Sequence, residues 1–66
     1  MNSDLIKKLE AELKEYKDKT NRLDHFLHTD DAEALDDYDL GLLQHQRKEL
    51  IRLTVIVELR LRSLKG

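Results

Sequence analysis

The 66-residue chain contains no cysteine and no proline, and its only glycines are Gly41 and Gly66. The absence of cysteine excludes disulfides, thiolate zinc sites and cysteine nucleophiles. Because proline is absent and glycine is rare, few residues would interrupt a helix, and this favours an almost wholly helical chain. We therefore expect an all-α fold in a single domain that spans residues 1–66.

Long apolar runs are also missing from the sequence. At 39% charged and 39% hydrophobic residues, the chain has no apolar stretch of the length that a membrane-spanning helix needs. Its longest apolar segment, residues 50–61, is interrupted by Arg52, Glu58 and Arg60. The first residues lack the basic-then-apolar pattern of a secretory signal. These features predict no membrane partner and a cytoplasmic location.

An apolar seam runs through the first half of the chain. It consists of Ile6, Leu9, Leu13, Tyr16, Thr20, Leu23 and Leu27, which recur at alternating spacings of three and four residues. This spacing places residues on one helix face that packs against another helix. We expect a helix over residues 3–28, with Ser3 as its N-cap. Tyr16 is then either an aromatic residue in the helix interface or a stacking platform for a ligand.

An acidic connector follows over residues 29–37. Residues 30–39 carry six acids and no base, and Asp30 and Asp36 are natural N-caps. Asp37, Asp39 and Gly41 alternate as in a calcium-binding EF-hand loop, but the twelfth position from Asp37 is lysine where that loop requires glutamate. We therefore expect helix caps here and no metal site.

A second helix is predicted over residues 38–64, antiparallel to the first. Its predicted seam consists of Leu43, Gln46, Leu50, Leu53, Val57 and Leu64, with Arg60 where a further apolar residue would stand. Five apolar residues lie off this seam: Ile51, Val55, Ile56, Leu59 and Leu61. One partner helix cannot cover so wide an apolar surface, so we expect the two-helix hairpin to assemble into a helical homo-oligomer. Gln46 and Arg60 would either fix the register of an interface or contact a ligand.

No catalytic arrangement is readable in the sequence. It shows no Ser/His/Asp set, no carboxylate pair in a plausible cleft and no glycine-rich phosphate loop, so we expect neither an enzyme nor a bound cofactor. The second helix is rich in arginine and lysine, which attract phosphates. However, the acidic connector and an isoelectric point near 5.9 disfavour binding to long nucleic acids.

The order of these features resembles a group of small helical-hairpin phage proteins, the anti-CBASS cyclic-oligonucleotide sponges. The resemblance covers residues 9–61 and includes RLDHFL, LLQHQRKEL and the final VELR. In those relatives the second helix carries a Leu-Leu pair, a glutamine, an apolar residue and a Val/Leu-Glu-x-Arg ending. The matching positions here are Leu42, Leu43, Gln46, Leu50, Val57, Glu58 and Arg60.

This resemblance implies an assembly, a hexamer in the sponges, that sequesters cyclic di- or trinucleotides in the host bacterial cytoplasm and so silences an immune effector. In those proteins a tyrosine of the first helix stacks on a base, and a lysine and a threonine beyond that helix reach the phosphates. Here Tyr16 supplies the aromatic ring, although alignment on Leu23 to Leu27 places the family tyrosine at Leu13. His28 and Thr29 follow the helix, and Asp30 comes next.

The ligand-binding residues that we predict are therefore Tyr16, His28, Thr29, Gln46 and Arg60. Gln46 and Arg60 stand at the positions that would line the second, trinucleotide site of those relatives. The alternative interpretation is a structural or adaptor hairpin, which assembles with itself or docks on a larger phage or host protein. Phosphate binding by the basic second helix is a third and weaker interpretation.

Overall fold

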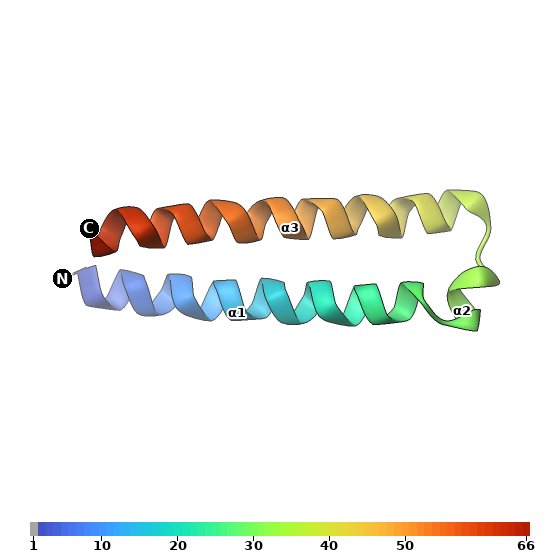
Figure 1. Cartoon of the computed structure of the whole chain (residues 1–66), viewed down its shortest axis with the longest axis horizontal. Helices are drawn as coiled ribbons and strands as arrows, with labels where there is room; N and C mark the ends of the chain where they lie inside the picture. The colour runs from blue at the N-terminus through green and yellow to red at the C-terminus, as the bar shows by residue number, and fades with distance from the viewer. Residues whose placement is uncertain (1) are drawn as a thin grey trace.

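The structure is a computed structural model that describes residues 2–66 as two long antiparallel helices joined by a short one. Helix α1 spans Asn2–Leu27, α2 spans Asp30–Glu33 and α3 spans Asp37–Lys65. The start of α1 and the end of α3 lie side by side, and α2 forms the closed end of the hairpin (Figure 1). The predicted all-α hairpin with a helical connector is confirmed, and the observed helix ends lie close to the predicted ones.

The helix caps agree with the sequence in one case and differ in two. Asp36 is the N-cap of α3, and its carboxylate accepts a hydrogen bond of 2.8 Å from the backbone N–H of Asp39. The predicted cap Asp30 lies instead in the first turn of α2, because Thr29 caps that helix. Ser3 is not an N-cap, since α1 already begins at Asn2.

The seam predicted for α1 is confirmed. All of its seven residues are buried or half-buried, whereas most of the residues between them are exposed. Leu9 is the most buried of them, with an exposed fraction of 2%. The alternating spacing of three and four residues therefore identifies the face of α1 that contacts α3.

The seam predicted for α3 is partly wrong. The buried and half-buried residues that face α1 are Leu40, Leu43, Arg47, Leu50, Thr54, Val57, Leu61 and Leu64. The two seams share Leu43, Leu50, Val57 and Leu64, but the predicted Gln46, Leu53 and Arg60 are exposed. Arg47 takes an inward position because it pairs with Asp24 of α1. Thr54 lies seven residues later on the same face of α3, where it lines a groove with Thr20.

The apolar core is small and lies toward the open end of the hairpin. Leu9, Val57 and Leu61 form its buried centre. Partly buried residues surround this centre: Ile6, Leu13, Tyr16 and Leu64. Toward the closed end, the buried apolar residues are Leu50 of α3 and Ala32 of α2.

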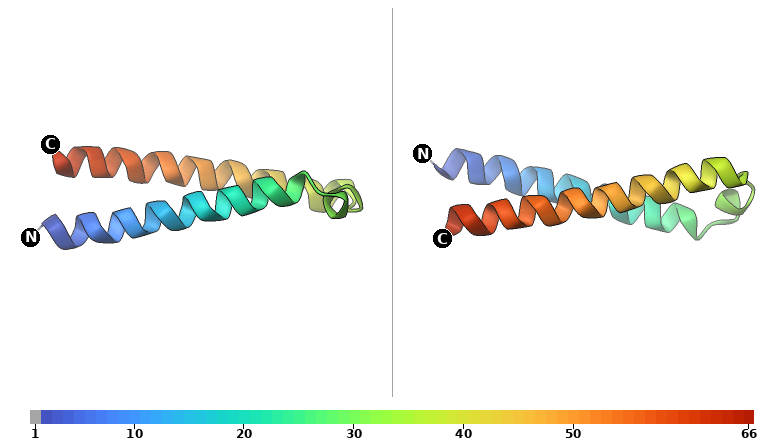
Figure 2. Two further views of the ribbon diagram at one scale, coloured as in Figure 1. Left: turned by 60° about the horizontal axis from the view of Figure 1, so that its bottom comes forward. Right: turned by 90° about the horizontal axis from the view of Figure 1, so that it is seen from above.

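The chain has the dimensions of a rod, 49 × 14 × 13 Å, with a radius of gyration of 15.0 Å. A compact domain of this length would have a radius of gyration of about 11 Å. The accessible surface is 5334 Å², whereas a typical compact monomer of 7.8 kDa exposes about 4,400 Å². The two helices cross at a shallow angle, and no other described element covers their outer faces (Figure 2).

Much of the uncovered surface is apolar and belongs to α3. Six of its aliphatic side chains are exposed, in addition to Tyr38: Leu42, Ile51, Leu53, Val55, Ile56 and Leu59. Even so, no helix of residues 2–66 combines the length and apolarity needed to cross a membrane.

The Asp36 cap generates a test of the fold. We expect Asp36→Ala to lower the free energy of unfolding by about 0.5–2 kcal/mol, because the N–H of Asp39 loses its acceptor. Asp37→Ala is the matched control, since it removes an acid from the same helical turn without removing the cap. Urea denaturation of the variants at one protein concentration gives the comparison. Equal losses in the two variants would contradict a capping role for Asp36.

Candidate functional site

The candidate site is the side of the hairpin along which ion pairs join α1 to α3. Five residues of α1 and His28, which follows it, form a stripe beside the seam. They line grooves on this side: Glu10, Lys14, Lys17, Asn21, Asp24 and His28. Three ion pairs join this stripe to α3. They are Glu10 with Lys65 at 3.4 Å, Lys17 with Glu58 at 3.9 Å, and Asp24 with Arg47. We call this surface the polar flank.

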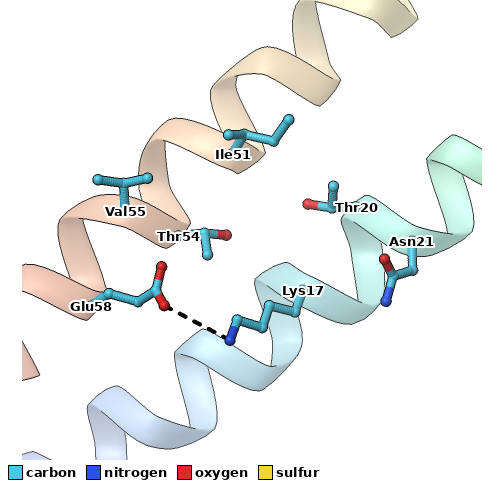
Figure 3. A pocket seen from close by; sticks show the side chains of 7 residues that line it. All are labelled: Lys17, Thr20, Asn21, Ile51, Thr54, Val55 and Glu58. Atoms are coloured by element: carbon cyan, nitrogen blue, oxygen red, sulfur yellow. Dashed lines mark ion pairs between the residues drawn. The ribbon is translucent and has the colours of Figure 1, made fainter.

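A groove of about 310 Å³ lies in the middle of the polar flank (Figure 3). Lys17, Thr20 and Asn21 line it from α1, and Ile51, Thr54, Val55 and Glu58 line it from α3. The hydroxyls of Thr20 and Thr54 point toward each other from the two helices (Figure 3). The middle groove therefore combines two apolar side chains with amide, hydroxyl and charged groups.

The two threonine hydroxyls keep acceptor capacity in this groove. Thr20 donates a hydrogen bond of 2.7 Å to the carbonyl of Tyr16, and Thr54 donates one of 2.8 Å to the carbonyl of Leu50. A hydroxyl has one proton to donate and two lone pairs that accept. Each oxygen can therefore still accept a hydrogen bond from a ligand.

A second groove, of about 390 Å³, lies near the closed end of the hairpin. Asp24, Leu27 and His28 line it from α1 and the residue after it, and Gln44, Arg47 and Lys48 line it from α3. Here Arg47 is held by its ion pair with Asp24. Lys48 takes part in no ion pair within residues 2–66. The closed-end groove thus gathers three basic side chains, those of His28, Arg47 and Lys48, around the carboxylate of Asp24.

His28 lines the closed-end groove, and one of its two ring nitrogens is engaged by the backbone. Its Nδ1 lies 2.7 Å from the backbone carbonyl oxygen of Asp24. A carbonyl can only accept, so Nδ1 donates and carries the proton. The contact leaves Nε2 for a ligand, where it accepts when the ring is neutral and donates when the ring is charged.

The structure brings only one of the five predicted ligand-binding residues into these grooves, namely His28. Tyr16 is half-buried and packs against the core. The Thr29 hydroxyl is used locally, donating to the carbonyl of Phe26 at 2.6 Å and accepting from the N–H of Ala32 at 3.4 Å. Gln46 and Arg60 are exposed on α3.

Sequence reasoning missed Gln44, Arg47 and Lys48 as neighbours of His28. The usable signal was Arg47, which lies four residues after Leu43 and three before Leu50, at a seam position of its own. An arginine on the face that packs against α1 needs an acidic partner there, which is Asp24. Residues 2–66 contain no group of three or more His, Cys, Asp or Glu side chains arranged to hold a metal ion.

Comparison with known proteins identifies one family. A family model described as Sequestin matches residues 3–49, which include α1, α2 and the first part of α3. Because the match covers more than half of the chain, the chain belongs to the Sequestin family. No curated protein and no solved structure matches it. The matched residues include every residue that lines the closed-end groove.

Replacing both threonines by valine tests whether their hydroxyls in the middle groove stabilise the fold. We expect the double variant Thr20→Val and Thr54→Val to be at least as stable as the natural chain. Each hydroxyl bonds only to a carbonyl of its own helix, and a methyl group of the same shape packs better in a seam. Thermal unfolding at one protein concentration measures this. A loss of more than about 1 kcal/mol would show that the hydroxyls are structural.

Proposed function

We propose that this member of the Sequestin family sequesters a cyclic oligonucleotide second messenger, a di- or trinucleotide, and performs no chemistry on it. The family name denotes sequestration, and the resemblance to phage sponges supplies the ligand class. The observation that carries the proposal is the closed-end groove, where His28, Arg47 and Lys48 converge from the two long arms of the hairpin.

The chemistry of this groove suits a phosphodiester. Arginine and lysine form short, charge-assisted hydrogen bonds with phosphate oxygens. Asp24 orients the guanidinium of Arg47, and the unpaired Lys48 adds a mobile point charge. The groove can therefore supply the cationic contact that a lysine after the first helix supplies in the sponges.

The middle groove offers a place for a base. Ile51 and Val55 present apolar surface to a flat ring, while Asn21 and Thr54 can hydrogen-bond to its edge. Lys17 and Asp24 lie seven residues apart on α1, which is about 10 Å along the helix. A nucleotide phosphate and a neighbouring base can span this interval.

Sequestration requires more than one chain. Binding sites for small molecules bury about 70–90% of their ligand, and these grooves are open on a rod only 14 × 13 Å across. We propose that further copies of the chain close the grooves, in a homo-oligomer such as the hexamer of the sponges. Gln46 and Arg60 lie outside these grooves on α3 and would contribute to contacts between the copies.

A structural or adaptor function is the second candidate, and one observation favours it. Ile51, Val55 and Leu59 form an exposed apolar stripe along α3. Contiguous apolar surface of this kind often marks a protein interaction site. In that case the stripe docks on a larger protein and the hairpin binds no nucleotide.

Calorimetric titration with a panel of cyclic di- and trinucleotides tests the proposal, with the linear forms as controls. We expect at least one cyclic ligand to bind, and a ligand at 100 times its Kd to stabilise the fold by about 2.7 kcal/mol. If only the linear nucleotides bound, the grooves would remain the proposed binding site, but the ligand would not be a cyclic oligonucleotide. No heat with any nucleotide would reject the proposal in favour of the adaptor.

The closed-end groove is tested by Lys48→Ala. We expect about tenfold weaker binding of the cyclic ligand and a shallower salt dependence, because one phosphate contact is lost. Lys8→Ala removes the same charge from an exposed position of α1 outside the middle and closed-end grooves and is the control. Equal weakening in both variants would show that binding follows net charge and does not use this groove.

A further inference from the structure

A second seam runs along α3, outside the face that contacts α1. It consists of Leu42, Gln46, Glu49, Leu53, Ile56 and Arg60, which recur at alternating spacings of four and three residues. We call it the outer seam. Five of its six members are exposed and Glu49 is half-buried, so α1 does not cover it. Its spacing is the pattern by which one helix packs lengthwise on another.

The charges of the outer seam are arranged symmetrically about its apolar centre. Leu53 and Ile56 form this centre, with exposed fractions of 39% and 46%. Glu49 lies four residues before Leu53, and Arg60 lies four residues after Ile56. Glu49 and Arg60 therefore carry opposite charges at equal distances from the point midway between Leu53 and Ile56.

We propose that the outer seam is a self-complementary interface, in which α3 of one chain packs antiparallel on α3 of a second copy around a two-fold axis. The axis passes between Leu53 and Ile56. Leu53 then lies opposite Ile56 of the second copy, and Glu49 lies opposite Arg60 of that copy, each pair occurring twice. Gln46 of one copy lies opposite Ser63 of the other, so this pair is polar as well.

Charge determines the orientation of the two helices. In a parallel pair in register, Glu49 would face Glu49 and Arg60 would face Arg60, and like charges across an interface are strongly unfavourable. The antiparallel pair converts both repulsions into attractions. Arg60 is free for this role, because it takes part in no ion pair within residues 2–66. Glu49 has only an exposed contact of 3.8 Å with Arg52.

The other exposed stripe of α3 lacks this complementarity. Ile51, Val55 and Leu59 are continued on the same face by Lys48 and Arg62. A two-fold axis through Val55 would place Lys48 opposite Arg62 of the second copy, which repels. The outer seam is therefore the face that fits another copy.

The surface area also fits a dimer. The chain exposes 5334 Å², about 900 Å² more than a compact monomer of its mass. A standard stable interface buries about 800 Å² on each partner. This inference concerns the assembly assumed in the proposed function, but it does not depend on which ligand is bound.

Charge reversal tests the interface in the full chain without ligand. Sedimentation velocity across 1–100 μM should show a dimer or a larger even-numbered assembly for the natural chain. Glu49→Arg and Arg60→Glu should each weaken association at least about tenfold, and the double variant should restore it. Arg62→Glu, a control with the same charge change on another face of α3, should have no such effect. Circular dichroism confirms that each variant is helical.

Three results would overturn the interface. They are a natural chain that stays monomeric, an assembly that neither single variant weakens, and a double variant no better than the single ones. The first result would also remove the oligomer from the proposed function. The other two would leave the oligomer and its ligand intact, because they concern this face alone.

A label distance tests the orientation independently. The chain has no cysteine, so Ala34→Cys provides one unique site for a spin label at the exposed connector. The start of α3 lies about 26 Å along the helix from the proposed axis. The two labels should therefore be about 50 Å apart in the antiparallel dimer. A distance below about 20 Å would indicate parallel chains and overturn the proposal.

Discussion

Two packed helices can cover only one face of each other, and α3 is apolar on more than one face. This constraint explains most of the structure. The core that the hairpin can enclose is small, with Leu9, Val57 and Leu61 at its centre. Apolar side chains such as Leu53 and Leu59 are left in solvent. Domains of this size rarely gain enough stability from one core without disulfides or metals, and oligomerisation is the usual remedy.

The two flanks of the hairpin consequently differ in character. The polar flank carries the ion pairs between α1 and α3, but these pairs are half-exposed and contribute little to stability. A side chain in a weak ion pair of this kind can easily change its partner. An anionic ligand can compete with Glu58 for Lys17, which lies 3.9 Å away. The outer seam carries apolar residues framed by opposite charges, which suits association with a second copy. The grooves proposed for the ligand and the outer seam proposed for the α3–α3 contact thus lie on different faces of the rod.

The sequence predicted the fold and the packing face of α1 well because both follow from periodicity. It failed for the register of α3, where Gln46 and Arg47 are neighbours and both continue a helical repeat from Leu43. Hydrophobicity alone favoured Leu53 over Thr54, whereas the pairing of Arg47 with Asp24 of α1 fits a register that places Thr54 inward. The cap of α2 was misplaced by one residue, since Thr29 and Asp30 both serve well as caps. The closed-end groove depends on the α3 register, and for this reason His28 was predicted without Arg47 and Lys48.

If a second copy of the chain completes the fold, stability depends on protein concentration. The most direct measurement is the thermal unfolding midpoint by circular dichroism at 1 and 100 μM. For a dimer that unfolds to separate chains, a hundredfold dilution lowers the free energy of unfolding by about 2.8 kcal/mol. We expect the midpoint to fall by roughly 10 °C. A midpoint that does not move between the two concentrations would contradict the account, because the hairpin would then be stable alone.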